Sequence, residues 1–405
     1  MTPRDSEAPT LFVSAAEQSA DEHAAGLIRA FRALWPGAEF VGLAGPQMRA
    51  AGCTGLADLT TRASMLTAVV GRAPAAARAV ARVDRLLARR PFDAAVLVDS
   101  GTLHLPLARR CRARGVPVFY FIAPQTWASR AWRLRALRER VDRLAVILPF
   151  EEEYFRRAGV PATFVGHPLI DRLADAPADR AYVAARRAEG SPVVALLPGS
   201  RRQVVAEVLP GQIAVAAAVA ARFRRARFLL AAANSAAEAL ARQIIARSAG
   251  APPITIETAH RDDVLAAAEF ALVASGTATL EAAYHRVPMI VMYNARGARW
   301  LYPLLRGRVI HAPMLSLPNL LAGRAVVPEF MPWYRNTTEI AVTAVELLSS
   351  PARLERMRQE LGGLIAPLEA ARALPAAARA LADLLADAPP RRARSGPVGS
   401  RHAVW

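Results

Sequence analysis

The sequence predicts an α/β protein in which two Rossmann-like domains face each other across a cleft. Short apolar runs alternate with longer segments rich in Ala, Leu and Arg, and this alternation occurs twice along the chain. Strands that alternate with helices in this way form doubly wound parallel sheets. A length of 405 residues is sufficient for two such domains.

The first alternation predicts an N-terminal domain over residues 1–170. The expected strands are Leu11–Ala15, Phe40–Leu43, Ala94–Val98, Val116–Phe121 and Leu144–Leu148. Helical patterns lie between most of these strands, for example over Ala24–Leu34 and Leu105–Ala113.

The pattern weakens over residues 171–190, which we predict to link the domains because they are rich in Ala, Arg and Asp and precede Ser191-Pro192. A second domain is predicted over residues 191–350. Its expected strands are Val193–Leu197, Phe228–Ala232, Ile254–Ile256, Phe270–Val273 and Met289–Met292. C-terminal helices are expected over 351–387 and a basic disordered tail over 388–405.

The chain is strongly basic, with a formal net charge of +18 and no lysine. This surplus of arginine favours an anionic partner, namely nucleic acid, acidic lipid or a phosphorylated substrate. Aromatic residues make up only 6% of the chain and no nucleic-acid-binding motif is present. We therefore expect no nucleic-acid partner.

Two cysteines and seven scattered histidines predict neither a disulfide framework nor a metal site. The first ten residues are polar and lack the basic-then-apolar order of a signal peptide. The longest uniformly apolar run, Ile213–Ala221, is too short to span a bilayer. A cytoplasmic protein is expected.

Two glycine-containing loops in the second half follow predicted strands. The first contains Gly199, Ser200 and Arg201, where a glycine allows a tight turn, a hydroxyl can donate to an oxyanion and a guanidinium can bind phosphate. No Walker loop and no G-x-G-x-x-G after the first strand is present, so ATP, NAD and other cofactors are not expected. Taken alone, this loop could also be an ordinary strand-to-helix turn.

The second loop contains Ser275, Gly276, Thr277 and Ala278, and precedes a predicted helix that includes Glu281. Ser275 is a candidate N-cap, and the helix N-terminus would stabilise a diphosphate. A carboxylate at Glu281 can accept hydrogen bonds from both ribose hydroxyls. A capped core helix with a surface glutamate is the alternative, but two such loops together predict a nucleotide-diphosphate site.

These loops belong to a set of strings that resembles the lipid-A-disaccharide synthase family. The resemblance extends from about residue 11 to 380 and rests on Phe40–Met48, Ala51–Cys53, Phe150–Glu151, Phe164–Leu169, Leu197–Arg201, Ala274–Ala278 and Ser316–Arg324. The last of these strings, SLPNLLAGR, is the most specific.

The resemblance implies a GT-B fold and an inverting, metal-independent hexosyl transfer. The donor would be UDP-2,3-diacylglucosamine, the acceptor 2,3-diacylglucosamine 1-phosphate and the product a β-1,6 disaccharide for lipid A. Both substrates carry acyl chains, so the implied location is the inner face of the cytoplasmic membrane. The resemblance also implies a homodimer.

It further assigns roles to individual residues. Asp99, at the end of the strand Ala94–Val98, resembles the catalytic aspartate and would act as general base. Arg201 would neutralise the leaving diphosphate. Asn319 and Arg324 match motif positions near the nucleotide site.

The acceptor side departs from the family pattern. Glu17, Ser19 and Asp21 match a loop that reads G-E-T-S-G-D in the family, but alanine replaces both glycines; Gln125 is a further candidate on this side. After Asp99, the chain has Gly101–His104 in place of Pro-Asp-Phe-Asn. A divergent synthase, a paralogue with a changed acceptor and an inactive protein all remain open.

Residues 75–90 are predicted to form a basic amphipathic helix. Arg78 and Arg82 lie on one of its faces, and the apolar residues Met65, Leu66, Val69 and Val70 precede it. Such a surface would contact an anionic membrane. A solvated helix packed on the sheet is the alternative.

Two other functions compete with the synthase. One is a different GT-B enzyme, such as a UDP-N-acetylglucosamine 2-epimerase, which would act on a UDP-sugar without an acceptor. The other is a non-catalytic UDP-sugar-binding protein, which would bind UDP without turnover.

Overall fold

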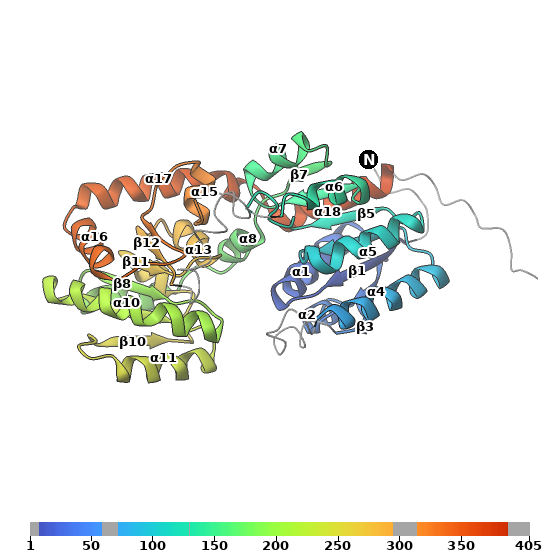
Figure 1. The fold of residues 1–405 in the computed structure, drawn as a ribbon. Coiled ribbons are helices and arrows are strands. Elements are labelled where there is room, and N and C mark those ends of the chain that lie inside the picture. Colours follow the sequence, from blue (N-terminus) through green and yellow to red (C-terminus); the bar gives the residue numbers. More distant parts are fainter. Residues whose placement is uncertain (1–7, 59–71, 129, 295–313, 388–405) are drawn as a thin grey trace, which may run out of the picture.

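Two parallel β-sheets form the two lobes of the protein (Figure 1). The structure is a computed structural model that describes residues 8–58, 72–128, 130–294 and 314–387. The predicted patch Met65, Leu66, Val69 and Val70 and the predicted tail 388–405 lie outside the described residues.

The N-terminal sheet has seven strands in the order β3-β2-β1-β4-β5-β6-β7. They are β1 (Thr10–Ala15), β2 (Glu39–Leu43), β3 (Thr54–Ala57), β4 (Ala94–Val98), β5 (Val118–Phe121), β6 (Arg143–Val146) and β7 (Ala162–Phe164). The helices of this part of the chain are α1 (Gln18–Leu34), α2 (Pro46–Ala50), α4 (Arg72–Arg89), α5 (Gly101–Ala113), α6 (Arg133–Arg140) and α7 (Pro149–Arg157).

Side chains of the central strand β1 alternate between two cores. Leu11 and Val13 pack with α1, whereas Phe12 packs in a core that includes Val83 of α4 and Leu107 of α5. Because successive strand residues point to opposite faces, a sheet covered by helices on both sides buries nearly all residues of its inner strands. Among the inner strands of this sheet, only the first residues of β1, β2 and β6 are partly or fully exposed.

The C-terminal sheet has six strands in the order β10-β9-β8-β11-β12-β13. They are β8 (Val193–Leu197), β9 (Arg227–Ala231), β10 (Ile254–Glu257), β11 (Phe270–Val273), β12 (Met289–Met292) and β13 (Glu329–Phe330). The remaining helices are α8 (Pro168–Asp175), α9 (Arg180–Glu189), α10 (Arg202–Arg222), α11 (Ser235–Arg247), α12 (Val264–Ala267), α13 (Ala278–Tyr284), α15 (Leu317–Ala322), α16 (Thr338–Leu348), α17 (Pro351–Ala370) and α18 (Ala373–Asp387).

The predicted linker 171–190 is helical in the structure, because it contains the end of α8 and all of α9. Tyr182 of α9 packs in the core of the C-terminal sheet. The strands β3, β7 and β13 were not predicted; they have two to four residues each, too short to produce a clear periodic pattern.

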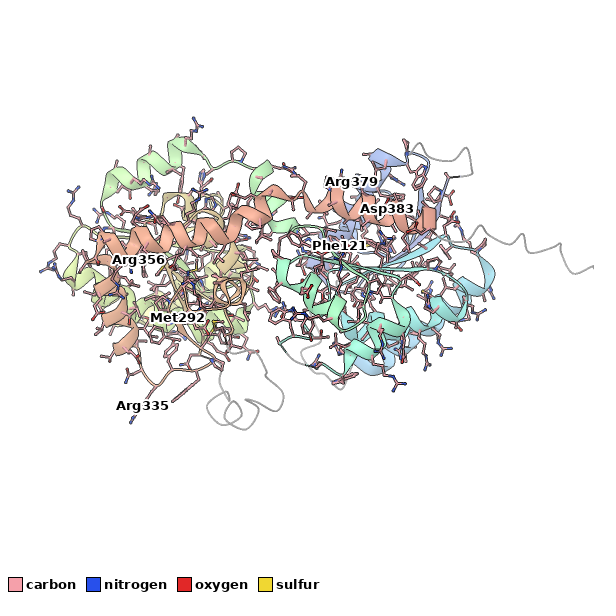
Figure 2. The ribbon with its side chains drawn as sticks, turned by 90° about the horizontal axis from the view of Figure 1, so that it is seen from above. Phe121, Met292, Arg335, Arg356, Arg379 and Asp383 are labelled. Atoms are coloured by element: carbon pink, nitrogen blue, oxygen red, sulfur yellow. The ribbon has the colours of Figure 1, made fainter. Side chains whose placement is uncertain are left out.

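The last two helices return the chain to the N-terminal lobe. Figure 2 shows α17 over the C-terminal lobe and α18, with Arg379 and Asp383, over the N-terminal lobe. Gly26 of α1 makes this packing possible, since a Cβ there would lie 2.7 Å from Leu374. The Asp171 carboxylate accepts hydrogen bonds from the Ala373 and Leu374 amides and so caps the start of α18.

Helix α10 is the only described helix long and apolar enough to span a membrane, with 21 residues and a mean hydropathy of 1.8 over its most apolar stretch. It extends beyond the apolar run noted in the sequence. Val205, Val208 and Ile213 on this helix are buried in the core of the C-terminal sheet. This burial is that of a core helix rather than of a membrane span.

Candidate active site

Asp99 lies on an unusual turn at the carboxyl end of β4. Asp99 and Ser100 both adopt left-handed backbone conformations, with φ of 57° and 44°. Such conformations cost non-glycine residues about 1–2 kcal/mol each and persist only where surrounding contacts hold them. The sequence did not predict this strain.

Three buried side chains hold the turn in place. The Tyr120 hydroxyl and His104 Nδ1 each donate to the Asp99 carbonyl oxygen, both over 2.6 Å, and the Ser14 hydroxyl lies 2.9 Å from His104 Nε2. Burial lowers the pKa of His104 to about 4, so its imidazole is neutral. Nδ1 then carries the ring proton and donates it in the hydrogen bond to the Asp99 carbonyl oxygen, whereas Nε2 accepts a hydrogen bond from the Ser14 hydroxyl. His104 therefore has a positioning role for the Asp99 turn.

The turn leaves the Asp99 carboxyl group largely buried next to a second carboxylate. Burial raises the pKa of Asp99; the Ser100 backbone amide opposes the rise, and the negative charge of Glu17 adds to it. The structure therefore places these two predicted residues within electrostatic range of each other. A carboxylate with a raised pKa is a stronger base than one in water.

The other predicted acceptor-side residues have different surroundings. Both carboxylate oxygens of Asp21 accept backbone amides at the start of α2, from Gln47 over 2.8 Å and Met48 over 3.1 Å, so Asp21 is a structural cap. Ser19 and Gln125 are exposed. Neither alanine that replaces a family glycine, Ala16 or Ala20, has a positive φ, so this loop needs no rearrangement.

Glu151 and Trp127 position the loop that carries Gln125. Glu151 is fully buried at the start of α7 and accepts hydrogen bonds from the Trp127 indole over 3.0 Å and from the backbone amides of Ile147 and Leu148. Burial raises the pKa of Glu151 to about 7, although these three donors oppose the rise. Of these two residues, only Glu151 belongs to the sequence strings on which the family resemblance rests.

The first glycine loop forms a sharp turn between β8 and α10. Gly199 has a φ of +97°, and a Cβ there would lie 2.9 Å from Val204, so only glycine fits. Ser200 and Arg201 are exposed, and no carboxylate of the described residues lies within ion-pair distance of Arg201. Arg201 is also the N-cap of the 21-residue helix α10, and no side chain caps that end. Free amides and an unpaired guanidinium together suit an anion.

The second loop lies next to the first, because Gln212 of α10 donates hydrogen bonds to Leu197 at the end of β8 and to Leu272 in β11. Gly276 has a φ of +136° with open space beside it. The expected N-cap at Ser275 is wrong: α13 begins at Ala278 with Thr277 as the N-cap, and no side chain caps it. Helix α13 has only seven residues, whereas α10, which begins at the first loop, has 21. The longer helix α10 therefore contributes the stronger positive potential at the two loops.

Glu281 projects from α13 into a cluster of charges. Its carboxylate lies 2.9 Å from Arg172 of α8 and 3.6 Å from Arg261, with 16% of the side chain exposed. Burial raises the pKa of Glu281, and the two arginines oppose the rise. The sequence did not predict Arg172, which lies over a hundred residues away in the chain and connects α8 to the nucleotide-side helix.

The side-chain amide of Asn319 makes all of its hydrogen bonds to other groups of the protein. Its Oδ1 accepts the Val326 and Val327 amides, and its Nδ2 donates to Val327 O and to the Glu329 carboxylate. Both donors and both acceptor positions of the amide are therefore used. Arg324 lies after the left-handed Gly323 and pairs with Glu360 of α17 over 3.3 Å. In this structure both residues hold the SLPNLLAGR segment in place.

Among the described residues, no group of three or more His, Cys, Asp or Glu side chains could hold a metal ion.

Solved structures with the same architecture act on activated sugars. The UDP-GlcNAc 2-epimerase of Neisseria meningitidis, solved with UDP-GlcNAc, aligns with a TM-score of 0.58 at 11% identity, covering 93% of this chain and 98% of that one. The calicheamicin glycosyltransferase CalG4 aligns with a TM-score of 0.58 at 14% identity, covering 95% and 100%. At these identities the likeness shows the fold, which is the two-domain GT-B fold.

Sequence comparison narrows this class. Residues 11–372 match the family model described as lipid-A-disaccharide synthetase. The lipid-A-disaccharide synthase of Solibacter usitatus is 37% identical over 359 residues, covering 87% of this chain and 91% of the relative. That of Myxococcus xanthus is 35% identical over 393 residues, covering 95% and 99%. The chain belongs to the lipid-A-disaccharide synthase family and is a hexosyltransferase.

Proposed function

We propose that the chain transfers 2,3-diacylglucosamine from UDP to the 6-hydroxyl of 2,3-diacylglucosamine 1-phosphate, with inversion, to form a β-1,6 disaccharide. The observation that carries the proposal is the Asp99 turn. A carboxylate with a raised pKa lies at the carboxyl end of the parallel strand β4, on a strained turn fixed by Tyr120 and His104. The ends of parallel strands are where open α/β sheets bind their ligands.

In the proposed reaction, the Asp99 carboxylate takes the proton of the acceptor 6-hydroxyl while the oxygen of that hydroxyl attacks the anomeric carbon of the donor sugar. The bond to UDP breaks on the opposite face of the sugar, which accounts for inversion. A base in this position typically contributes about 10²–10⁴-fold to the rate. Burial of Asp99 favours the reaction because it makes the carboxylate more basic.

The leaving UDP requires stabilisation of its diphosphate. Arg201 is exposed and unpaired among the described residues, and the free amides at the start of α10 add positive potential. The open space beside Gly276 lets the diphosphate approach the backbone, and Gly199 allows the sharp turn that presents the Ser200 hydroxyl as a donor. The second-loop residues Ser275, Thr277 and Ala278 complete the proposed cradle.

Glu281 is proposed to accept the ribose hydroxyls. The Arg172 and Arg261 guanidinium groups favour its ionised form against the effect of burial, and they fix its direction. Asn319 and Arg324 would act through the segment that they hold in place.

We also propose that the enzyme works as a peripheral protein on the inner, cytoplasmic face of the cytoplasmic membrane, where acylated substrates reside. On α4, Arg78 and Arg82 are exposed whereas Val83 and Leu87 are buried against the sheet. This arrangement supports electrostatic attraction to an anionic leaflet by α4 rather than apolar insertion of that helix. Replacing Arg82 and Arg85 with Gln should weaken co-sedimentation of the protein with anionic vesicles and leave its co-sedimentation with neutral vesicles unchanged. Binding of the variant to anionic vesicles as tight as that of the wild type would contradict this role.

The family resemblance supports a homodimer. Light scattering on the purified protein should give twice the chain mass of 43.5 kDa. A single chain mass at all concentrations would contradict it.

The central experiment uses both acylated substrates in detergent micelles and detects the disaccharide by mass spectrometry. The wild type should form the disaccharide 1-phosphate, and Asp99→Asn should lose about 10²–10⁴-fold in kcat. Ser349→Ala, a change at an exposed residue outside every predicted site, is the control. Absence of product from the wild type, with UDP still bound, would mean that the acceptor or the activity has changed.

A further inference from the structure

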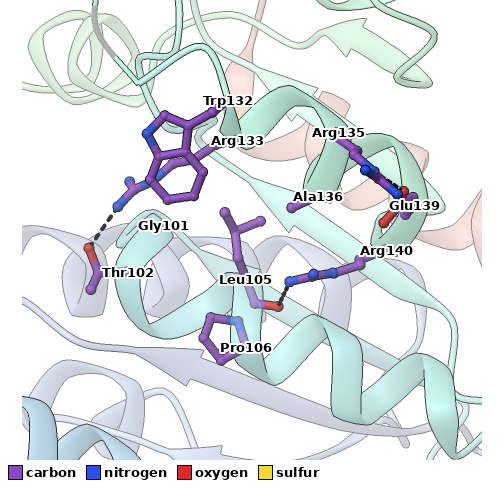
Figure 3. A pocket seen from close by; sticks show the side chains of 10 residues that line it. All are labelled: Gly101, Thr102, Leu105, Pro106, Trp132, Arg133, Arg135, Ala136, Glu139 and Arg140. Atoms are coloured by element: carbon purple, nitrogen blue, oxygen red, sulfur yellow. Dashed lines mark hydrogen bonds and ion pairs between the residues drawn. The ribbon is translucent and has the colours of Figure 1, made fainter. Parts of the chain in front are cut away.

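A cavity of about 480 Å³ lies between α5 and α6, beside the turn that carries Asp99 (Figure 3). Its walls come from the first half of α5 and from α6 with the preceding Trp132. The lining residues are Gly101, Thr102, Leu105, Pro106, Trp132, Arg133, Arg135, Ala136, Glu139 and Arg140. The site described above makes no use of this cavity.

Two cations of this cavity, Arg133 and Arg140, form no ion pair among the described residues, and of the two only Arg133 has a buried donor without a partner. Arg135 pairs with Glu139 over 2.7 Å, and Arg140 donates to the Leu105 carbonyl oxygen over 3.2 Å. Among the described residues, no carboxylate lies within ion-pair distance of Arg133. Its Nη2 donates to the Thr102 hydroxyl over 3.1 Å, and its Nε is buried without a hydrogen-bond partner. An unpaired guanidinium with unused donors favours an anionic ligand.

The same cavity has an apolar side. Trp132 is 72% exposed, the most exposed large apolar side chain of the described residues. Figure 3 shows its ring above Leu105 and Pro106, with Ala136 on the facing helix. The Arg133 guanidinium lies 5.3 Å from the Trp132 ring centre, which brings the cation next to the apolar surface. The cavity therefore suits a ligand that carries both an anion and a hydrocarbon chain.

Gly101 places this cavity next to the catalytic turn. Helix α5 begins at Gly101, two residues after Asp99. A Cβ at this position would lie 2.9 Å from Arg133 Nη1 and 3.0 Å from Pro124, so a side chain there would displace the guanidinium. The absence of a side chain at Gly101 allows Arg133 to reach the start of α5.

We propose that this cavity holds the phosphate-bearing end of the acceptor, with the phosphate on Arg133 and Thr102 and an acyl chain against Trp132 and Leu105. This inference rests on the proposed function, because that acceptor carries a phosphate and acyl chains on one hexose. The 6-hydroxyl and the 1-phosphate lie on opposite sides of a single sugar ring. One molecule can therefore present its hydroxyl to Asp99 and its phosphate to the neighbouring cavity.

The kinetic test is Arg133→Gln in micelles of a neutral detergent. Loss of a charge-assisted hydrogen bond should raise the KM for the phosphorylated acceptor by about tenfold to a hundredfold. The KM for the UDP-sugar and the kcat at saturating acceptor should stay within about twofold, and Arg133→Lys should restore part of the loss. Arg110→Gln, an exposed arginine on α5 outside the cavity lining, is the matched control.

The binding test needs no turnover. The phosphorylated acceptor should change the tryptophan fluorescence of the wild type, and this change should be smaller with the acceptor lacking its phosphate and absent in Trp132→Phe. An unchanged acceptor KM in Arg133→Gln overturns the proposal. If that variant instead binds anionic vesicles less tightly, the cavity serves membrane lipid headgroups. An inactive wild type overturns the proposed function, whereas an active wild type with an unaffected variant overturns only this inference.

Discussion

The strained turn at Asp99 makes Tyr120→Phe the most informative single substitution. This change removes one hydroxyl and keeps the ring, which is fully buried. The hydroxyl donates over 2.6 Å to the Asp99 carbonyl oxygen, which retains its hydrogen bond from His104 after the substitution.

The expected change in the free energy of unfolding follows from two opposing contributions. The lost hydrogen bond destabilises the fold by about 1 kcal/mol. The left-handed conformations of Asp99 and Ser100 together cost about 2–4 kcal/mol, so a turn held by one bond instead of two can relax and recover part of that cost. We therefore expect a change of less than about 1 kcal/mol in the free energy of unfolding. Relaxation moves the carboxylate, and a misplacement of about 1 Å can lower kcat by about 10²-fold.

Urea unfolding and steady-state UDP release measure the two quantities on the same preparation. Tyr154→Phe on α7 is the matched control and should keep its kcat. In an Asp99→Asn background, Tyr120→Phe should cause no further fall in rate, because the group that it positions is already disabled. A kcat within about twofold of the wild type for Tyr120→Phe alone would refute the reasoning.

Three further predictions concern the donor loop, the motif asparagine and a buried carboxyl. Gly199→Ala should lower UDP affinity at least about tenfold because it combines a positive φ with a clash at Val204; Gly115→Ala has a positive φ with nothing nearby, and calorimetry should find its UDP affinity unchanged. Asn319→Ala should destabilise the fold by roughly 2–4 kcal/mol in urea unfolding, since it leaves two buried backbone amides unpaired; a loss below about 1 kcal/mol would contradict this. The pKa of Glu151 is raised in the fold from 4.5 to about 7, so its contribution is present below about pH 4.5 and lost as the pH rises through about 7, roughly 3 kcal/mol in all. Glu151→Gln should remove that part of the pH dependence between about pH 4.5 and about pH 7. Plots of unfolding free energy against pH that run parallel for variant and wild type would contradict it.

The sequence predicted the parts of the fold that have a strong local pattern. The inner strands of both sheets are mostly apolar because helices cover both faces, and a continuous apolar run such as Ala94–Val98 is easily identified. Asp99 could be placed at the end of such a strand for the same reason. The missed edge strands β3, β7 and β13 have two to four residues, and the return of α18 onto α1 depends on a long-range contact at Gly26. Neither produces a periodic signal.

The details of the site could be predicted only in part. Glycines in both loops and an arginine in the first predict a phosphate site by their chemistry alone. By contrast, the positioning role of His104 arises from contacts with Ser14 and with the Asp99 backbone, which only the tertiary structure brings together. Asp21 likewise has the composition of a binding residue, but two backbone amides of α2 occupy its oxygens.

Acceptor-dependent release of UDP tests the central claim most directly. The purified protein would be given the acylated UDP-sugar with and without 2,3-diacylglucosamine 1-phosphate, and free UDP would be measured over time. We predict release only when the acceptor is present, and its loss in Asp99→Asn. Conversion of the UDP-sugar without acceptor, or no UDP release with both substrates present, would contradict a glycosyl transfer catalysed by Asp99.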